Sequence, residues 1–233
     1  MCSRYFLDAD GNIIAYTFRV PPNPGVRPRY NIAPTQEAPV IRRAKSEDRE
    51  RGVERELAFL RWGLVPFFAK DPSVGNKMIN ARAETVAEKP AFREALAKRR
   101  CLVPASGFYE WKGAPGRKQP FAITFPKEPI FAFAGLWERW KAKDGDPIDT
   151  FTIVTTDASP AVAGIHDRMP VILPREAHEA WLSGEPAEAA KLLKTYTDPT
   201  NVRAVKKLVS DPRNDGPECL EDEPGWDSQR DLF

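Results

Sequence analysis

A cysteine stands directly behind the first methionine, as the second residue of the sequence. If Met1 is removed, Cys2 carries an α-amine and a thiol on adjacent carbons, an arrangement that no internal cysteine offers. The reference pKa values of the two groups, about 8 and about 8.5, leave part of each in its nucleophilic form at neutral pH. Such a 1,2-aminothiol condenses with aldehydes. Judged on these two residues alone, a cysteine without a function is the simpler interpretation.

Two further stretches combine polar groups with apolar neighbours. Residues 80–85, which read NARAET, offer an amide, a guanidinium and a carboxylate, and the N-terminal cap of a helix explains them equally well. Glu110 lies within the aromatic stretch GFYEW at 107–111 and shares a strand face with Phe108. It is therefore either an edge residue facing water, which is the commoner case, or a carboxylate in an apolar site with a raised pKa.

Two other stretches contain a histidine and an aromatic pair. His166, one of only two histidines, is expected in a loop before a strand, and imidazole is the usual proton donor or acceptor near neutral pH. Arg168, two residues later, has the geometry to bind a phosphate. Phe67 and Phe68 follow one another on an expected loop. There they could stack on bases or wedge between them, whereas packing under the loop is the default.

The composition bounds the class of protein. The chain has 233 residues, of which 42% are hydrophobic and 29% charged, as in a soluble globular protein of one domain. Asp8 and Asp10 follow the start at once, so no signal peptide is expected, and no apolar run is long enough to span a membrane. Three cysteines without metal-ligand spacing and two histidines predict no metal and no cofactor, in a reducing cytoplasm.

Charge is distributed unevenly along the chain. Residues 211–233 contain eight acidic and two basic side chains, net −6, which leaves +8 for residues 1–210 of a chain whose total is +2. A basic body of this size permits a polyanionic partner without requiring one.

The order of expected elements favours an α+β fold. Residues 30–34 and 40–41 read as short extended pieces, and the charged stretch 46–56 as an exposed helix or a loop. Strands are expected at 57–62, 101–104, 107–112, 120–125, 130–140 and 150–155, and helices at 90–100, 175–182 and 186–193. Consecutive strands with few helices and little βαβ alternation predict one domain around a mixed or antiparallel sheet.

Six motifs together are more specific than any one of them. In order they are MC (1–2), RYNIAP (29–34), RWGLVP (61–66), NARAET (80–85), GFYEW (107–111) and IHDRMP (165–170). This set strongly resembles the SOS-response-associated peptidase (SRAP) family, over residues 2 to about 220. The resemblance implies a single SRAP-like domain over residues 1–220, with a mixed, antiparallel or barrel-like core and a few flanking helices. An acidic tail, residues 221–233, would follow it.

Members of that family protect abasic sites in single-stranded DNA through a covalent crosslink. The resemblance implies that Met1 is removed and that the Cys2 amine attacks the aldehyde of the ring-opened abasic sugar. Thiolate attack on the resulting Schiff base would close a thiazolidine and shield the lesion during replication. The implied protein is a monomeric enzyme that removes its own Met1, with Schiff-base chemistry of the kind abasic-site lyases use.

The family roles carry over motif by motif. Cys2 would be the nucleophile, Asn80 would orient it, Glu110 would shuttle protons, and His166 would act as general acid and base in ring opening. The implied DNA-binding residues are Arg4, Arg82 and Arg168 for phosphates, with Pro34, Phe67 and Phe68 as a wedge that turns a continuing duplex away.

The chain departs from the family pattern at two places. Better-known members have glycine where this chain has Ser3, so the closest approach of backbone to DNA would differ slightly. They also have tryptophans where Phe67 and Phe68 stand, and phenylalanine still stacks but lacks the indole donor.

The end of the acidic tail offers a second partner. Gln229, Leu232 and Phe233 form a pattern similar to the short peptide that docks in the bacterial sliding clamp. A disordered acidic tail with two apolar residues explains the same stretch about equally well.

Three other interpretations of the whole chain remain open. Cys2 and His166 could form a cysteine peptidase, for which removal of Met1 would be the only cleavage needed. The basic body could bind single-stranded or modified DNA without covalent chemistry. The chain could also be an interaction protein in which Met1 keeps Cys2 capped.

Overall fold

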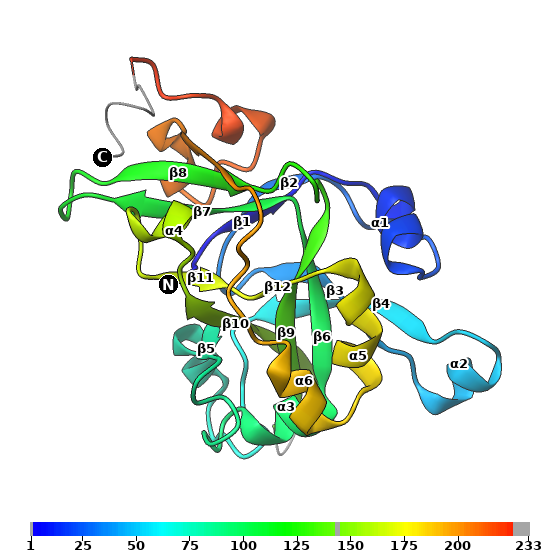
Figure 1. Cartoon of the computed structure of the whole chain (residues 1–233). Helices are drawn as coiled ribbons and strands as arrows, with labels where there is room; N and C mark the ends of the chain where they lie inside the picture. Colours follow the sequence, from blue (N-terminus) through cyan, green and yellow to red (C-terminus); the bar gives the residue numbers. More distant parts are fainter. Residues whose placement is uncertain (1, 143–144, 226–233) are drawn as a thin grey trace.

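A closed ring of five strands forms the centre of the molecule (Figure 1). The computed structural model describes residues 2–142 and 145–225. The ring consists of β3 (Glu37–Arg43), β4 (Arg55–Trp62), β6 (Arg100–Ala105), β9 (Phe131–Trp140) and β10 (Ile148–Asp157). β10 pairs with β4 in parallel, and the other four pairings are antiparallel. The predicted α+β fold with a mixed, barrel-like core is confirmed.

The ring closes because its strands are apolar on the face that points inward. Every residue of β6 is buried, and the interior holds the fully buried rings of Trp62, Phe133 and Phe151. A β-carbon added to Gly135 would come within 2.8 Å of Cys101 Sγ, so glycine allows β9 to pass close to β6.

A second sheet of five strands lies against the ring. In spatial order its strands are β13 (Asn201–Ala204), β8 (Gln119–Thr124), β7 (Gly107–Lys112), β1 (Tyr5–Leu7) and β2 (Arg29–Ile32). β1 therefore lies between β7 and β2, paired antiparallel with both. The first residues of the chain are held inside a sheet, which orders a segment that would otherwise be exposed and poorly ordered.

Three short strands join the edges of the ring. β5 (Asn80–Arg82) pairs in parallel with β10, just beyond the point where β4 ends along that strand. β11 (Arg168–Pro170) pairs antiparallel with the last residues of β10, and β12 (Ile172–Leu173) pairs with β9. The segment that precedes β5, the loop that precedes β11 and the start of β1 meet on one side of the molecule (Figure 1).

Short helices cover the remaining faces. The α-helices are α1 (Gly11–Phe18), α2 (Ser46–Glu50), α3 (Arg93–Lys98), α4 (Pro160–Ala163), α5 (His178–Ser183) and α6 (Pro186–Lys191). Turns of 3-10 helix are η1 (Pro72–Lys77), η2 (Arg175–Ala177), η3 (Lys207–Ser210) and η4 (Pro217–Leu220). α1 was not predicted, although the Asp10 side chain caps it by accepting from the backbone N–H groups of Asn12 and Ile13.

Several predicted boundaries were wrong. The helix expected at 90–100 occupies only Arg93–Lys98, and Arg100 already belongs to β6. The buried Arg100 guanidinium donates to the carbonyls of Leu96 and Trp181, and these bonds tie the strand to the helices beside it. Residues 80–82 form a strand, so the interpretation of residues 80–85 as a helix cap was wrong.

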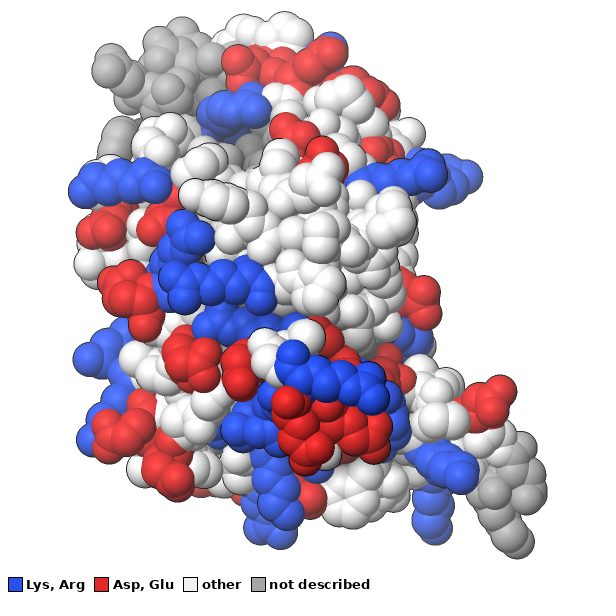
Figure 2. Space-filling model, turned by 90° about the vertical axis from the view of Figure 1, so that its right-hand side faces the viewer, with Lys and Arg blue, Asp and Glu red and all other residues white. Residues whose placement is uncertain are grey.

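Figure 2 shows the face of the molecule from which α2 projects toward the viewer. A broad uncharged area occupies its upper centre, and basic and acidic side chains mix below it, so no single sign of charge covers the area drawn. Within the described part of the chain, no helix has both the length and the apolar character needed to cross a membrane.

Candidate active site

A cavity of about 350 Å³ opens beside the first residues of the chain. Five segments that lie far apart in the sequence contribute to it: the start of β1, β7, the turn before β8, the loop before β11 and η3. Its lining residues are Ser3, Arg4, Glu110, Trp111, Lys118, His166 and Ser210. One carboxyl group (Glu110), one imidazole (His166) and two basic side chains (Arg4 and Lys118) thus face the same small cavity.

Cys2 lies immediately behind this cavity and is fully buried. The side-chain amide of Asn80 donates a hydrogen bond of 2.7 Å to the Cys2 carbonyl oxygen, which fixes the backbone of the cysteine. The Cys2 thiol points back toward the Arg4 carbonyl, 3.8 Å from Sγ. Burial raises the pKa of the thiol, and the negative charge of Glu110 raises it further. The thiol is therefore protonated at neutral pH and needs a proton acceptor before it can react.

Glu110 is a buried carboxyl group, with only 3% of its surface exposed. Burial raises its pKa to about 7, so it takes up and releases a proton near neutral pH. The expectation of a glutamate facing water was wrong, because both faces of β7 are covered. Phe108 packs into the main core, and Tyr109 packs with Val209 and Cys219 of the C-terminal segment.

His166 reaches the cavity from the loop that precedes β11. Its Nδ1 accepts a hydrogen bond of 2.9 Å from the backbone N–H of Arg168, so the neutral ring carries its proton on Nε2. Asp167 Oδ1 lies equally close to Nδ1, but that side chain is 86% exposed, and the fixed backbone donor decides the tautomer. Burial lowers the pKa of His166, and the ring is neutral at pH 7.

Arg168 is buried and pairs with groups of the protein itself. Its guanidinium bonds both carboxylate oxygens of Glu84, at 2.8 and 2.9 Å, and Asp157 Oδ1 at 2.6 Å. A further bond of 2.8 Å goes to the carbonyl of Thr155. Both terminal nitrogens of the guanidinium, which could otherwise bind a phosphate, are therefore already bonded to groups of the protein. Arg82, at the end of β5, is exposed instead.

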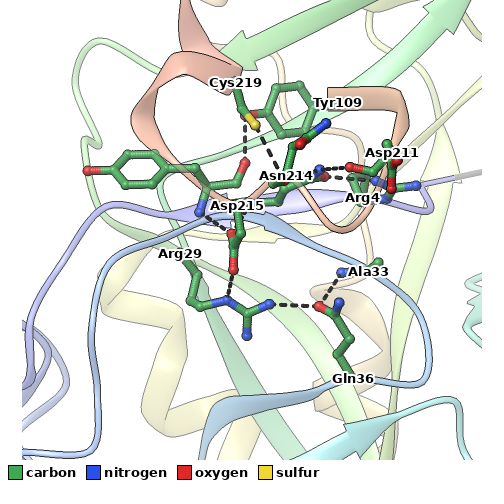
Figure 3. Close-up of polar contacts among 11 residues, drawn as sticks. Arg4, Arg29, Ala33, Gln36, Tyr109, Asp211, Asn214, Asp215 and Cys219 are labelled. Atoms are coloured by element: carbon green, nitrogen blue, oxygen red, sulfur yellow. Dashed lines mark hydrogen bonds and ion pairs between the residues drawn. The ribbon is translucent and has the colours of Figure 1, made fainter. Parts of the chain in front are cut away.

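Arg4 follows Cys2 closely and is held by polar contacts (Figure 3). Its Nη1 donates to Asn31 Oδ1 at 2.9 Å and to the Val209 carbonyl at 3.0 Å. The guanidinium lies over the ring of Trp111, 5.8 Å from its centroid. Arg4 therefore presents a cation to the cavity from a fixed position.

The expected wedge residues lie on exposed loops. Phe67 and Phe68 are 52% and 55% exposed, with their rings edge to face at 5.3 Å, so the interpretation that they pack under the loop was wrong. Pro34 is half-buried, and the turn that carries it is tied to the end of β4 by a bond of 2.8 Å from Thr35 N–H to the Trp62 carbonyl. None of the three lines the cavity.

The sequence did not identify four residues that line the cavity. Ser3 and Trp111 neighbour predicted site residues, and Lys118 returns to the cavity because β7 and β8 form a hairpin with Lys112 opposite Gln119. Ser210 arrives from the C-terminal segment, where Trp111 Nε1 donates to its hydroxyl at 3.3 Å. The alternation of β7 and β8 could have located Lys118, whereas the sequence contains no signal for Ser210. Gln229, Leu232 and Phe233, the residues predicted to bind a clamp, lie outside the described residues.

Comparison with known proteins gives consistent matches. The family model described as SOS response associated peptidase (SRAP) matches residues 1–212. The abasic site processing protein YoqW of Bacillus subtilis is 42% identical over 229 residues, covering 95% of this chain and 99% of YoqW. The abasic site processing protein HMCES of Gallus gallus is 38% identical, covering 83% of this chain and 66% of that protein. A crystal structure of a protein from Bacteroides thetaiotaomicron, 30% identical, superimposes with a TM-score of 0.82, covering 95% of this chain and 100% of that one.

Proposed function

This chain belongs to the SOS response associated peptidase (SRAP) family, and from that membership we propose that it processes abasic sites in single-stranded DNA by a covalent crosslink through Cys2. The relatives named abasic site processing proteins support the substrate class. One observation supports the chemistry most directly: Asn80 fixes the Cys2 backbone beside a cavity lined by Glu110 and His166. Each of these groups has a distinct task.

Opening of the abasic sugar is the first task, and we assign it to His166. In the neutral ring with Nδ1 engaged, Nε2–H is the proton available for donation. The bond between C1′ and the ring oxygen breaks, the anomeric hydroxyl gives its proton to the Glu110 carboxylate, and the Nε2–H hydrogen bond stabilises the ring oxygen until that oxygen takes up the proton, which yields the aldehyde at C1′. A partly buried imidazole with a lowered pKa suits this role, because it stays neutral and keeps its donor at Nε2.

Condensation follows and requires a group that both accepts and donates protons. With Met1 removed, the Cys2 amine adds to the aldehyde, and loss of water gives an imine. The thiol then adds to the imine carbon, the carbon–sulfur bond forms, and the thiol proton ends on the nitrogen of the thiazolidine. Glu110, whose pKa is about 7, is suited to take the thiol proton and to protonate the leaving hydroxyl. The sequence of steps consumes no oxidant or reductant.

The DNA is bound by charge and by stacking. Arg4 and the exposed Arg82 supply guanidinium groups for phosphates on either side of the lesion. Arg168 contributes indirectly, because its contacts with Glu84 and Asp157 anchor the loop that carries His166. Phe67 and Phe68 offer exposed rings on which unpaired bases stack, and we assign the half-buried Pro34 to the same wedge.

A cysteine peptidase that uses Cys2 and His166 is less well supported. Peptidase thiols have lowered pKa values because an imidazolium stands beside them. Burial and the nearby Glu110 instead raise the pKa of the Cys2 thiol. Removal of Met1 is thus the only peptide cleavage that we assign to this family member.

The test incubates the purified protein with single-stranded DNA that carries one abasic site. Denaturing gel electrophoresis and intact mass spectrometry follow the product, alongside Cys2→Ala and Cys219→Ala. Cys219 is as buried as Cys2 but lies in the C-terminal segment, so its variant is a matched control. We expect a denaturation-resistant adduct with the parent and with Cys219→Ala, and none with Cys2→Ala. No adduct from a parent protein shown to lack Met1 would sink the proposal in favour of non-covalent DNA binding.

A further inference from the structure

The segment 207–222, here called the C-terminal strap, lies against β2 and the start of β1 (Figure 3). It contains η3 and η4, and it is tied down by hydrogen bonds to residues almost two hundred positions earlier. The family model ends at residue 212, within this strap. The strap contributes Ser210 to the cavity, so it is part of the site's wall.

Asp215 is the central residue of the strap. One carboxylate oxygen accepts from the backbone N–H groups of Tyr30 and Asn31, each at 2.7 Å, and the other accepts from Arg29 Nε. The carboxylate is partly buried, with 27% of the side chain exposed. Asp215 thus satisfies donors that β2, an edge strand of the second sheet, would otherwise leave unpaired on that side.

A relay leads from Asp215 to the turn that carries Pro34. Arg29 Nη2 donates to Gln36 Oε1 at 2.7 Å, and the same oxygen accepts from the Ala33 N–H at 3.1 Å. Within this turn Thr35 has φ of 72°, a left-handed conformation that is strained for a β-branched residue. Such strain persists only where surrounding contacts over-determine the backbone, and the relay supplies them.

A second connection leads from the strap to Arg4. The fully buried Asn31 donates through Nδ2 to three strap carbonyls, those of Val209, Asp211 and Asn214. Its Oδ1 accepts from Arg4 Nη1, which also bonds the Val209 carbonyl. The side chain of Asn31 is therefore a junction through which the strap fixes the guanidinium beside Cys2.

We propose that the C-terminal strap positions the DNA-contacting groups, with Asp215 setting the Pro34 turn through Arg29 and Gln36, and Asn31 setting Arg4. Asp215 and Asn31 are positioning residues, since neither lines the cavity. The inference rests on the proposed crosslinking function. It predicts a specific defect: the loss of Asp215 changes the preference between DNA substrates, while the protein can still form the adduct.

The test measures single-turnover crosslinking at increasing protein concentration for the parent, Asp215→Asn and Glu218→Gln. Glu218 is an exposed carboxylate of the same strap, and it serves as the control. Two substrates carry the same abasic site, one in a single strand and one at a junction with duplex. For Asp215→Asn we expect the half-saturating concentration to rise roughly three- to tenfold and the preference between the two substrates to change. Glu218→Gln should match the parent.

A double-mutant cycle separates positioning from general weakening. Gln36→Ala breaks the relay at the next hydrogen bond. The half-saturating concentration of the double variant should therefore be close to that of either single variant, and the two fold-changes should not multiply. If Asp215→Asn does not fold, Gln36→Ala alone should still shift the substrate preference. Parent-like behaviour of both variants on both substrates overturns the inference. A parent protein that forms no adduct overturns the proposed function instead, so the two failures are distinguishable.

Discussion

The side chain of Asn80 holds the backbone of Cys2 across 78 positions of sequence, through a hydrogen bond of 2.7 Å to the cysteine carbonyl. The bond is possible because β5 pairs in parallel with β10 and thereby brings Asn80 beside the start of β1. In the proposed reaction, it restrains the residue whose amine and thiol must both reach one carbon atom. The hydrogen bond should orient Cys2 for the reaction, and it should not change the affinity of the protein for DNA.

Replacing Asn80 by alanine should slow the chemical step. We expect crosslinking at saturating DNA to fall on the order of 10²-fold, since displacement of a reacting group by about 1 Å costs that much. The affinity for single-stranded DNA should be unchanged. Fluorescence anisotropy and single-turnover gels measure the two quantities. Asn76→Ala is the control, because its exposed side-chain amide accepts a hydrogen bond from Arg61. Equal losses of rate in both variants would contradict the assignment.

Replacing Glu110 by glutamine should stabilise the protein more at high pH than at low pH. The pKa of Glu110 is about 7 in the folded protein against an ordinary value of 4.5. Between these values the unfolded chain releases a proton that the folded protein keeps, so rising pH favours unfolding by at most about 3 kcal/mol through this group. Glutamine does not titrate.

Thermal unfolding at pH 5 and pH 8 checks the sign of this effect. The Tm difference between Glu110→Gln and the parent should become more positive at pH 8. The exposed Glu88→Gln serves as a control and should track the parent at both pH values. A difference that does not change with pH would show that Glu110 does not retain its proton in the folded protein.

Removing the rings of Phe67 and Phe68 should weaken DNA binding without destabilising the fold. Both side chains are more than half exposed, so little packing is lost. Stacking contributes about 1–3 kcal/mol per base, which corresponds to a loss of roughly 5- to 150-fold in affinity for each base released. Titration of single-stranded DNA measures it. Tyr16→Ala, which removes an 81% exposed ring on α1, should bind as the parent does.

Arg82→Ala should reduce the salt dependence of binding. An exposed guanidinium that contacts one phosphate of single-stranded DNA contributes a slope of about −0.7 in log affinity against log salt concentration. The slope should therefore become shallower by about that amount, with Tm unchanged. Binding measured at several salt concentrations gives the slope. An unaltered slope would remove Arg82 from the phosphate contacts.

Arg168→Ala should act on stability first. Its loss leaves the Thr155 carbonyl and the carboxylates of Glu84 and Asp157 without their shared donor. We expect a destabilisation of about 1–3 kcal/mol. Urea unfolding of the parent, Arg168→Ala and Arg82→Ala separates the two arginines, because only the first variant should shift its midpoint. Parent-like stability of Arg168→Ala would restore it as a candidate phosphate ligand.

The strands of the ring could be predicted because their apolar runs are bounded by turn residues. β9, for example, was expected at residues 130–140 and occupies Phe131–Trp140. α1 could not, since its sequence GNIIAYTF contains β-branched and aromatic residues that are typical of strands. Its cap, Asp10, was the one local signal. For such a short helix, burial of Ile14 and Phe18 in the core decides the conformation.

The candidate site was predictable by residue type but not by environment. The position of Glu110 on β7 could be inferred, but whether its face meets water depends on segments far away in the sequence, such as the loop that carries His166, 56 residues later. Arg168 illustrates the same limit, because its partner Glu84 lies 84 positions earlier. Alternation within one strand carries no information about such distant neighbours.

The order in which the chain is synthesised gives the placement of β1 a further meaning. Residues Tyr5–Leu7 leave the ribosome early, yet their partner strand β7 ends only at Lys112. Until that strand has emerged, Cys2 has no complete sheet to bury it and is accessible to oxidants. Closure of the second sheet ends this interval. The time for which the thiol is exposed is therefore set by translation, and folding afterwards shields the thiol from everything that does not enter through the cavity.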